Sequence, residues 1–181
     1  MPVEAPAPST TVRSAPRPAT ALRDLSHRFF IEGLTGMAHG LFATLIIGTI
    51  LSQAGAFLPG AAGDVAVILG RVAAAITGAG IGLGVAHRLK ADTFVVISAA
   101  VAGQLGAQAG GLLSGTAIVT DTIGTGLMLR GPGEPLGAFL AAYAAIEAGR
   151  RVSGRTPVDI LVTPLTTIVT GGAVGLILGP P

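Results

Sequence analysis

The stretch FFIEGLTGMAHGLFATLIIGTIL, residues 29–51, decides the fold class of this chain. Its only fully ionised side chain is Glu32, and it is long enough to cross a hydrocarbon core, which takes about 20 helical residues. Three further apolar stretches, residues 65–85, 94–113 and 160–178, are long enough or nearly so. Two shorter apolar pieces, residues 116–129 and 136–148, lie between the last two. These patterns predict an all-α, polytopic transmembrane helix bundle.

The composition excludes most other classes of protein. Apolar residues make up 50% of the chain and charged residues only 11%, whereas a soluble domain carries about 25% charged residues. The chain has no cysteine, which excludes disulfides, thiolate metal sites and cysteine nucleophiles. The net charge of +2 resides in the first 28 residues, so no face for nucleic acid is predicted. Motifs of stand-alone enzymes are missing, and no catalytic residue, cofactor or metal site is predicted.

The N-terminal 28 residues differ in composition from the rest of the chain. They are rich in Pro, Ala, Ser and Thr and contain few large apolar side chains. Such a segment cannot bury enough surface to offset its ordering entropy. We therefore predict a disordered cytoplasmic tail over residues 1–28 and a transmembrane domain over residues 29–181.

Lys and Arg indicate the cytoplasmic side, because cytoplasmic loops of membrane proteins collect these residues. Nine of the 11 fall into three clusters: in the tail, at residues 87–90 and at residues 150–155. If all three clusters lie inside, the chain crosses the membrane an odd number of times between the third span and the last cluster. One crossing plus one re-entrant half-helix within residues 116–149 satisfies this condition. The sequence thus predicts about five spans, with the N-terminus in the cytoplasm and the C-terminus outside.

Polar groups at membrane depth are the candidate substrate-binding residues, because such groups usually face a cavity or a partner. The segment RGPGEP, residues 130–135, cannot continue a helix. Broken backbone inside a membrane is tolerated only where it is buried in protein or lines a cavity. Glu134 in this break offers acceptors for the hydroxyls of a polyol, and the alternative is an ordinary turn outside the membrane. The predicted site comprises Arg130, Gly133, Glu134, Thr163, Thr167, His39 and Gln108.

Several of these residues also have simple structural explanations. His39 in the first span is either a site residue or a hydrogen-bonded packing histidine. Thr163 and Thr167 flank Pro164 and fit a polar site or an interhelical packing surface equally well. Gln104 and Gln108 are four residues apart, so they share a helix face and either line one cavity or bond across helices.

Two long phrases of the chain resemble a bacterial family of polytopic proteins. The phrases FIEGLTGMAHGLFATLIIGTIL, residues 30–51, and GPGEPLGAFLAAYAAIEAGRRVSGRTPVDILVTPLTTIVTGG, residues 131–172, are similar to the membrane-spanning IIC component of sugar phosphotransferase systems. The same family includes membrane regulators of toxin expression of the PfoR type. The resemblance covers roughly residues 29–181. Gly-Glu-Pro at residues 133–135 also resembles the substrate loop of IIC transporters, in which the acidic residue binds a sugar hydroxyl.

The resemblance implies a protein of the bacterial inner membrane that binds and translocates a sugar or polyol. Separate cytosolic IIA and IIB partners would phosphorylate the arriving sugar, and the role of the acidic residue would fall on Glu134. Family members continue past the equivalent of Pro181 with further spans. The resemblance therefore implies the N-terminal half of such a protein, working as a homo-oligomer or with a second-half partner. The alternative is a membrane regulator or scaffold, or an ion-permeable protein, that transports no sugar.

Overall fold

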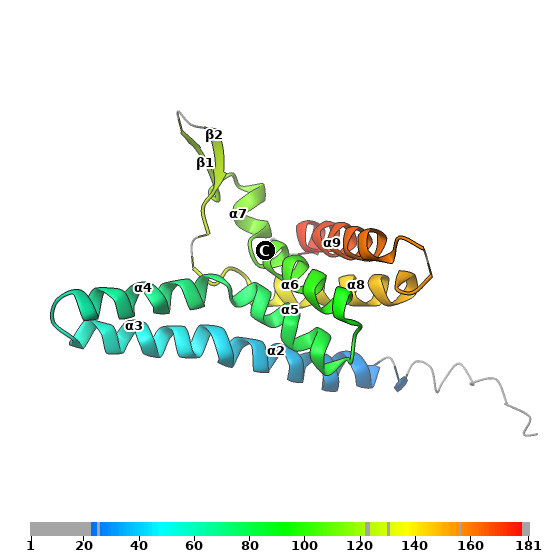
Figure 1. The fold of residues 1–181 in the computed structure, drawn as a ribbon, viewed down its shortest axis with the longest axis horizontal. Helices are drawn as coiled ribbons and strands as arrows, with labels where there is room; N and C mark the ends of the chain where they lie inside the picture. The colour runs from blue at the N-terminus through cyan, green and yellow to red at the C-terminus, as the bar shows by residue number, and fades with distance from the viewer. Residues whose placement is uncertain (1–22, 25, 122–123, 130, 156, 179–181) are drawn as a thin grey trace, which may run out of the picture.

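The computed structural model describes residues 23–24, 26–121, 124–129, 131–155 and 157–178 (Figure 1). Within these residues the fold is helical, as predicted, except for one hairpin of two strands. The label η denotes a π-helical turn. The elements are η1 (Arg28–Gly33), α2 (Leu34–Leu41), η2 (Phe42–Ile46), α3 (Ile47–Phe57), α4 (Ala61–Ala75), α5 (Thr77–Arg88), α6 (Thr93–Ala107), α7 (Ala109–Leu113), β1 (Ile118–Asp121), β2 (Gly124–Leu127), α8 (Pro135–Val152) and α9 (Asp159–Leu178).

The first four elements form one continuous helix of 30 residues, from Arg28 to Phe57. The residues at its internal junctions keep helical φ and ψ angles. At about 1.5 Å per residue, the helix is roughly 45 Å long. It ends because Pro59 forces the preceding Leu58 into an extended conformation, and Gly60 then turns the chain with a φ of +72°. The helix therefore extends past the predicted boundary at residue 51.

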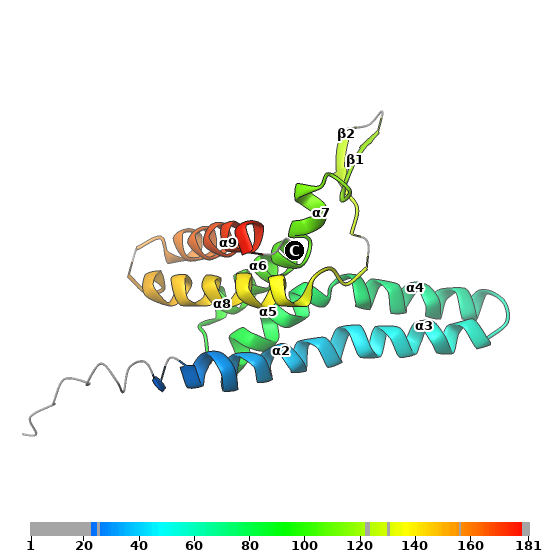
Figure 2. The ribbon, with the colours of Figure 1, turned by 180° about the vertical axis from the view of Figure 1, so that it is seen from behind.

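Helices α3 and α4 lie side by side and project beyond the other helices, as both views show (Figures 1 and 2). We call this pair the arm. The remaining long helices, α5, α6, α8 and α9, form the bundle. In the bundle, α6 packs against α5, α8 and α9, while α2 packs against α5 from the outside.

The centre of the bundle is apolar and tightly packed. Its fully buried large side chains include Phe139, Ile81 and Ile146. Small residues let the backbones approach: a Cβ on Gly36 of α2 would lie 2.6 Å from the carbonyl oxygen of Gly84 in α5. This packing mode is typical of helices in lipid, where close backbone contact replaces the hydrophobic driving force.

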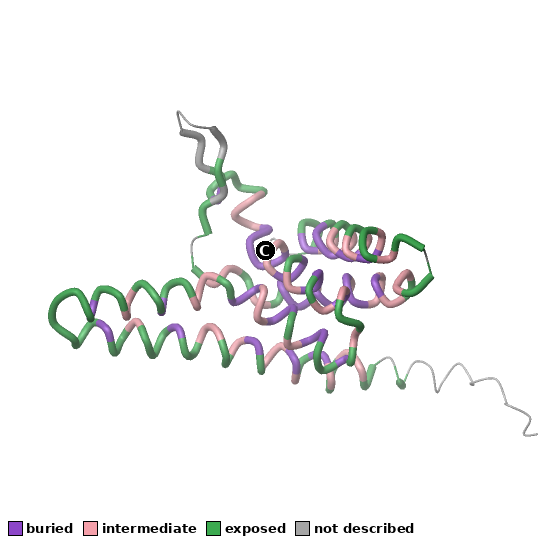
Figure 3. Tube along the Cα trace, viewed as in Figure 1, coloured by how far each residue is buried: buried purple, intermediate pink, exposed green. Residues whose placement is uncertain are grey.

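Much of the arm is exposed (Figure 3), and many of the exposed side chains of the molecule are large and apolar. Large exposed side chains on the arm include Phe57, Ile68 and Leu69. Among the residues that the structure describes, two helices are long and apolar enough to cross a membrane, Arg28–Phe57 and Asp159–Leu178. The bent pair of α4 and α5 adds a third if it forms one span. These features are those of a membrane protein. The full number of five crossings stays a prediction.

Residues 118–121 and 124–127, in the segment expected to hold a re-entrant half-helix and a crossing, instead form two β-strands. Strands β1 and β2 are antiparallel, with Ile118 opposite Leu127. The prediction of a half-helix was wrong because a short apolar run does not by itself distinguish a helix from strands. The segment is rich in β-branched residues, which favour strands: Ile118, Val119, Thr120 and Thr125.

Two of the predicted spans are broken, and the other boundaries shift by a few residues. The stretch 65–85 divides at Ile76, where α4 and α5 meet at an angle of 53°. The stretch 94–113 divides at Gln108, between α6 and α7. Most of the predicted tail, residues 1–22 and 25, lies outside the described residues. Its last described residues, 23–24 and 26–28, are helical, so the structured part begins before residue 29.

Candidate functional site

Two helix breaks and a glycine-rich loop meet at one place in the structure. A Cβ on Gly78, just after the first break, would lie 2.6 Å from the Cβ of Ala107, just before the second. The backbone amide of Glu134, in the loop between β2 and α8, donates to the carbonyl oxygen of Ala107 at 2.7 Å. We call this region the broken-helix site and define it by six residues: Thr77, Gln104, Gln108, Gly131, Gly133 and Glu134.

The first break lies at Ile76, which leaves the helical conformation with φ −94° and ψ 17°. The hydroxyl of Thr77 is fully buried and donates to the carbonyl oxygen of Ala74 at 2.7 Å. The side chain of Gln104 from α6 bonds to Ala75 and Ala79, on the two sides of the break. The polar groups that the bend exposes are thus paired inside the protein, as membrane burial requires.

The second break lies at Gln108, with φ −97° and ψ 4°. Its side chain is buried, and its Nε2 lies 3.5 Å from the carbonyl oxygen of Gly131. Gly131 and Gly133 adopt φ angles of +69° and +70°, a left-handed conformation that favours glycine. These two turns bring the loop against the end of α6.

Glu134 begins helix α8 as its N-cap residue. Its Oε1 accepts a hydrogen bond from the amide of Leu136 at 3.2 Å, and Pro135 occupies the first helical position. The carboxylate is exposed, so its remaining lone pairs are available to a ligand. An ionised carboxylate only accepts hydrogen bonds, which suits the hydroxyls of a sugar or polyol.

The structure brings together three of the predicted site residues, Gly133, Glu134 and Gln108. Arg130 lies outside the described residues. Thr163 and Thr167 are buried elsewhere: their hydroxyls bond to Asp159 and to the carbonyl oxygen of Thr163, respectively.

The position of the two threonines follows from the packing of α9 against α8. Thr167 lies against Gly149, near the C-terminal end of α8. Glu134 stands at the opposite end of that helix, about 22 Å away by helical rise. The two threonines and the glutamate therefore do not form one site.

His39 lines a separate groove between α2 and α5, of about 330 Å³. The groove also contains His87, from the last turn of α5, and is otherwise walled by small or apolar residues and Thr44. Both histidines are exposed rather than packed in the core. His39 is thus neither part of the broken-helix site nor a buried packing histidine.

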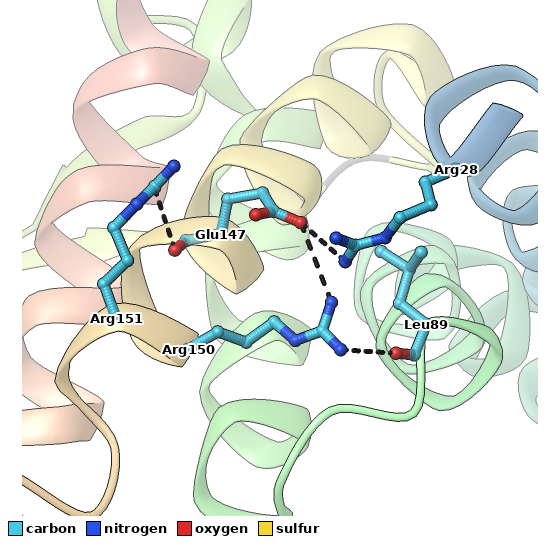
Figure 4. Close-up of polar contacts among 5 residues, drawn as sticks. All are labelled: Arg28, Leu89, Glu147, Arg150 and Arg151. Carbon is cyan, nitrogen blue, oxygen red and sulfur yellow. Dashed lines mark hydrogen bonds and ion pairs between the residues drawn. The ribbon is translucent and has the colours of Figure 1, made fainter. Parts of the chain in front are cut away.

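A polar cluster at the other end of α8 was not predicted (Figure 4). Glu147 Oε1 lies 2.9 Å from Arg28 Nη2 and 3.8 Å from Arg150 Nη1. Arg150 also donates to the carbonyl oxygen of Leu89 at 3.0 Å, and Arg151 donates to that of Glu147. Arg28, Leu89 and Arg150 each belong to a different one of the three basic clusters, so these contacts join one residue of each cluster near the C-terminal end of α8.

Sequence reasoning singled out neither Thr77 nor Glu147. Thr77 has a weak signal, since a threonine followed by glycine interrupts an otherwise apolar stretch. Glu147 is followed by Arg150 and Arg151, at spacings that place opposite charges on neighbouring helix positions. The other partner of Glu147, Arg28, lies 119 positions away in the chain, so no pattern in the sequence near Glu147 indicates this pair.

Comparison with known proteins places the sequence in a family. A family model described as "Phosphotransferase system, EIIC" matches residues 31–181. No curated protein and no solved structure matches the chain. Since the match covers most of the sequence, the chain belongs to the EIIC family of the phosphotransferase system.

Proposed function

We propose that the protein is an integral membrane component of a sugar phosphotransferase system. It binds a sugar or polyol and translocates it, and separate cytosolic IIA and IIB proteins phosphorylate the arriving sugar. Family membership supports the system, and the apolar helices support the membrane location.

The observation that carries this proposal is the meeting of two helix breaks with the loop at residues 131–134. Discontinuous helices of this kind build substrate sites in transporters, because their free ends and unwound backbone supply polar groups at membrane depth. Here Glu134 offers an exposed carboxylate and Gln108 offers a buried amide. Gly133, which has no side chain, lets the loop backbone approach the carbonyl group of Ala107 closely. In this proposal the carboxylate of Glu134 accepts hydrogen bonds from the hydroxyls of the substrate, and the side chain of Gln108 positions the loop.

We further propose that the protein lies in the bacterial inner membrane with its N-terminus in the cytoplasm and about five crossings. The contacts that join Arg28, Leu89 and Arg150, one residue from each basic cluster, support this orientation. The absence of cysteine allows single reporters at Leu58, at the tip of the arm, and at Lys90. In intact cells an impermeant maleimide should label Leu58→Cys and spare Lys90→Cys. The reverse pattern would invert the proposed topology.

The substitution Glu134→Gln tests the proposed site. Because glutamine keeps an acceptor for the Leu136 amide, the melting temperature without ligand should stay close to that of the wild type. A thermal-shift screen of the purified protein against sugars and polyols should find a stabilising compound, and Glu134→Gln should abolish that shift. Asp64→Asn, an equivalent change of an exposed carboxylate in the first turn of α4, should retain it.

Two results would overturn the proposal. If no sugar or polyol stabilises the wild type but an ion does, the protein is an ion-permeable or scaffolding component instead. If a sugar stabilises Glu134→Gln as strongly as the wild type, the substrate site lies elsewhere in the bundle.

A further inference from the structure

The side chain of Gln104 joins the two halves of the broken α4–α5 segment. Its Nε2 donates to the carbonyl oxygen of Ala75, the last residue of α4, at 2.9 Å. Its Oε1 accepts from the amide of Ala79, in the first turn of α5, at 3.0 Å. One side chain thus satisfies a free acceptor and a free donor on opposite sides of the bend.

The chemistry of these two bonds is specific to a carboxamide. A neutral amide carries a donor and an acceptor at its two ends, whereas an ionised carboxylate has acceptors only. Gln108, four residues later at the C-cap of α6, carries the same group, but its Nε2 lies 3.5 Å from the carbonyl oxygen of Gly131 in the loop instead. The two glutamines therefore act on different sides of the broken-helix site.

The bend matters because it sets the direction of the arm and the place of the substrate loop. Apart from the chain connection at Ile76, few residues of α4 contact α5, whereas α4 packs extensively on α3. The packing of α4 on α5 therefore contributes little to the angle between them. Directly after the bend, Gly78 packs on Ala107, whose carbonyl oxygen holds the amide of Glu134. A change of the bend would thus shift both the arm and the end of α6 that carries the loop.

We propose that Gln104 is a positioning residue, which holds α4 and α5 at their 53° angle and thereby fixes the position of the arm relative to the broken-helix site. That substrate binding depends on this relative position rests on the proposed function. The angle itself does not, so it is measured without ligand.

The experiment uses two spin labels on this cysteine-free chain, at the exposed positions Ala62 in the arm and Ile97 in α6. Ala62 stands about 20 Å from the bend by helical rise, so a 15° change of angle moves it by about 5 Å. Gln104→Met, which keeps the side-chain length and removes both bonds, should broaden or shift the measured distance by about 5 Å. Gln108→Met, the matched control, should leave the distance unchanged.

A second variant keeps the test informative if Gln104→Met folds poorly. Gln104→Glu retains a donor and an acceptor when protonated and loses the donor when ionised. Its distance distribution should match the wild type at pH 4 and resemble Gln104→Met at pH 9. The wild type, measured at the same two pH values, controls for the titration of every other group.

Two outcomes would overturn the inference. The first is a wild-type distance in Gln104→Met together with no pH dependence in Gln104→Glu. The second is an equal change in Gln104→Met and Gln108→Met, which would show that the bend does not depend on Gln104 in particular. Neither outcome bears on whether the protein binds a sugar.

Discussion

Replacing Gly133 by alanine tests whether the loop at residues 131–134 is docked on the end of α6. The substitution has two costs. Gly133 has a φ of +70°, where an alanine is disfavoured by about 1–2 kcal/mol. The new Cβ would also lie 2.7 Å from the carbonyl carbon of Ala107 and 2.9 Å from Nε2 of Gln108, well inside the 3.4 Å at which ordinary contact begins. Overpacking of this kind costs about 1–3 kcal/mol.

Gly131→Ala separates the two costs. Gly131 has nearly the same φ, +69°, but a Cβ there would meet nothing within 4 Å. Gly131→Ala should therefore lose about 1–2 kcal/mol, from backbone strain alone. Gly133→Ala should lose about 2–5 kcal/mol, and the difference between the variants measures the packing of the loop against α6.

The assay is thermal unfolding of the purified variants in one detergent, followed by circular dichroism. At roughly 2–4 °C per kcal/mol for a chain of this size, Gly133→Ala should melt several degrees below Gly131→Ala. Equal melting temperatures would refute the reasoning, because they would mean that no atom of α6 opposes a side chain at position 133. The broken-helix site would then lack its loop.

Three further predictions concern helix packing and polar contacts outside the broken-helix site. Gly36→Ala should lower the free energy of unfolding by about 1–3 kcal/mol, because the new Cβ would meet the backbone of α5. Gly110→Ala, where a Cβ would meet nothing within 4 Å, should leave the free energy of unfolding unchanged or raise it by up to about 1 kcal/mol. A double-mutant cycle of Arg28→Gln and Glu147→Gln should give a coupling of about 0.5–1 kcal/mol, because the arginine is 38% exposed; zero coupling would mean that the pair does not tie the N-terminal helix to α8. Thr167→Val should cost about 1 kcal/mol from its lost hydrogen bond and leave any sugar-induced thermal shift intact; a lost shift would return Thr167 to the substrate site.

The geometry of the candidate site was only partly predictable from the sequence. The helix break at Gly133 and Glu134 was predicted because glycine and proline at residues 131–135 act on the backbone locally. Thr163 and Thr167 were assigned to the same site because they lie near a helix-interrupting proline. Their distance from Glu134 depends on the way α9 packs along α8, and no pattern within either helix reports it.

From the sequence alone it follows that this is a membrane protein, that most of its basic residues fall into three clusters, and that the helical pattern breaks before α8. These properties follow from hydropathy, charge and backbone chemistry, which act over one or two helical turns. The tertiary structure alone decided the bend at Ile76, the pairing of Gln104 across it, and the contact of Arg28 with Glu147. Each depends on which residues that are far apart in the chain lie close together in the folded protein. A polar group buried in a membrane protein needs a hydrogen-bond partner, and the tertiary packing decides which residue is near enough to be that partner.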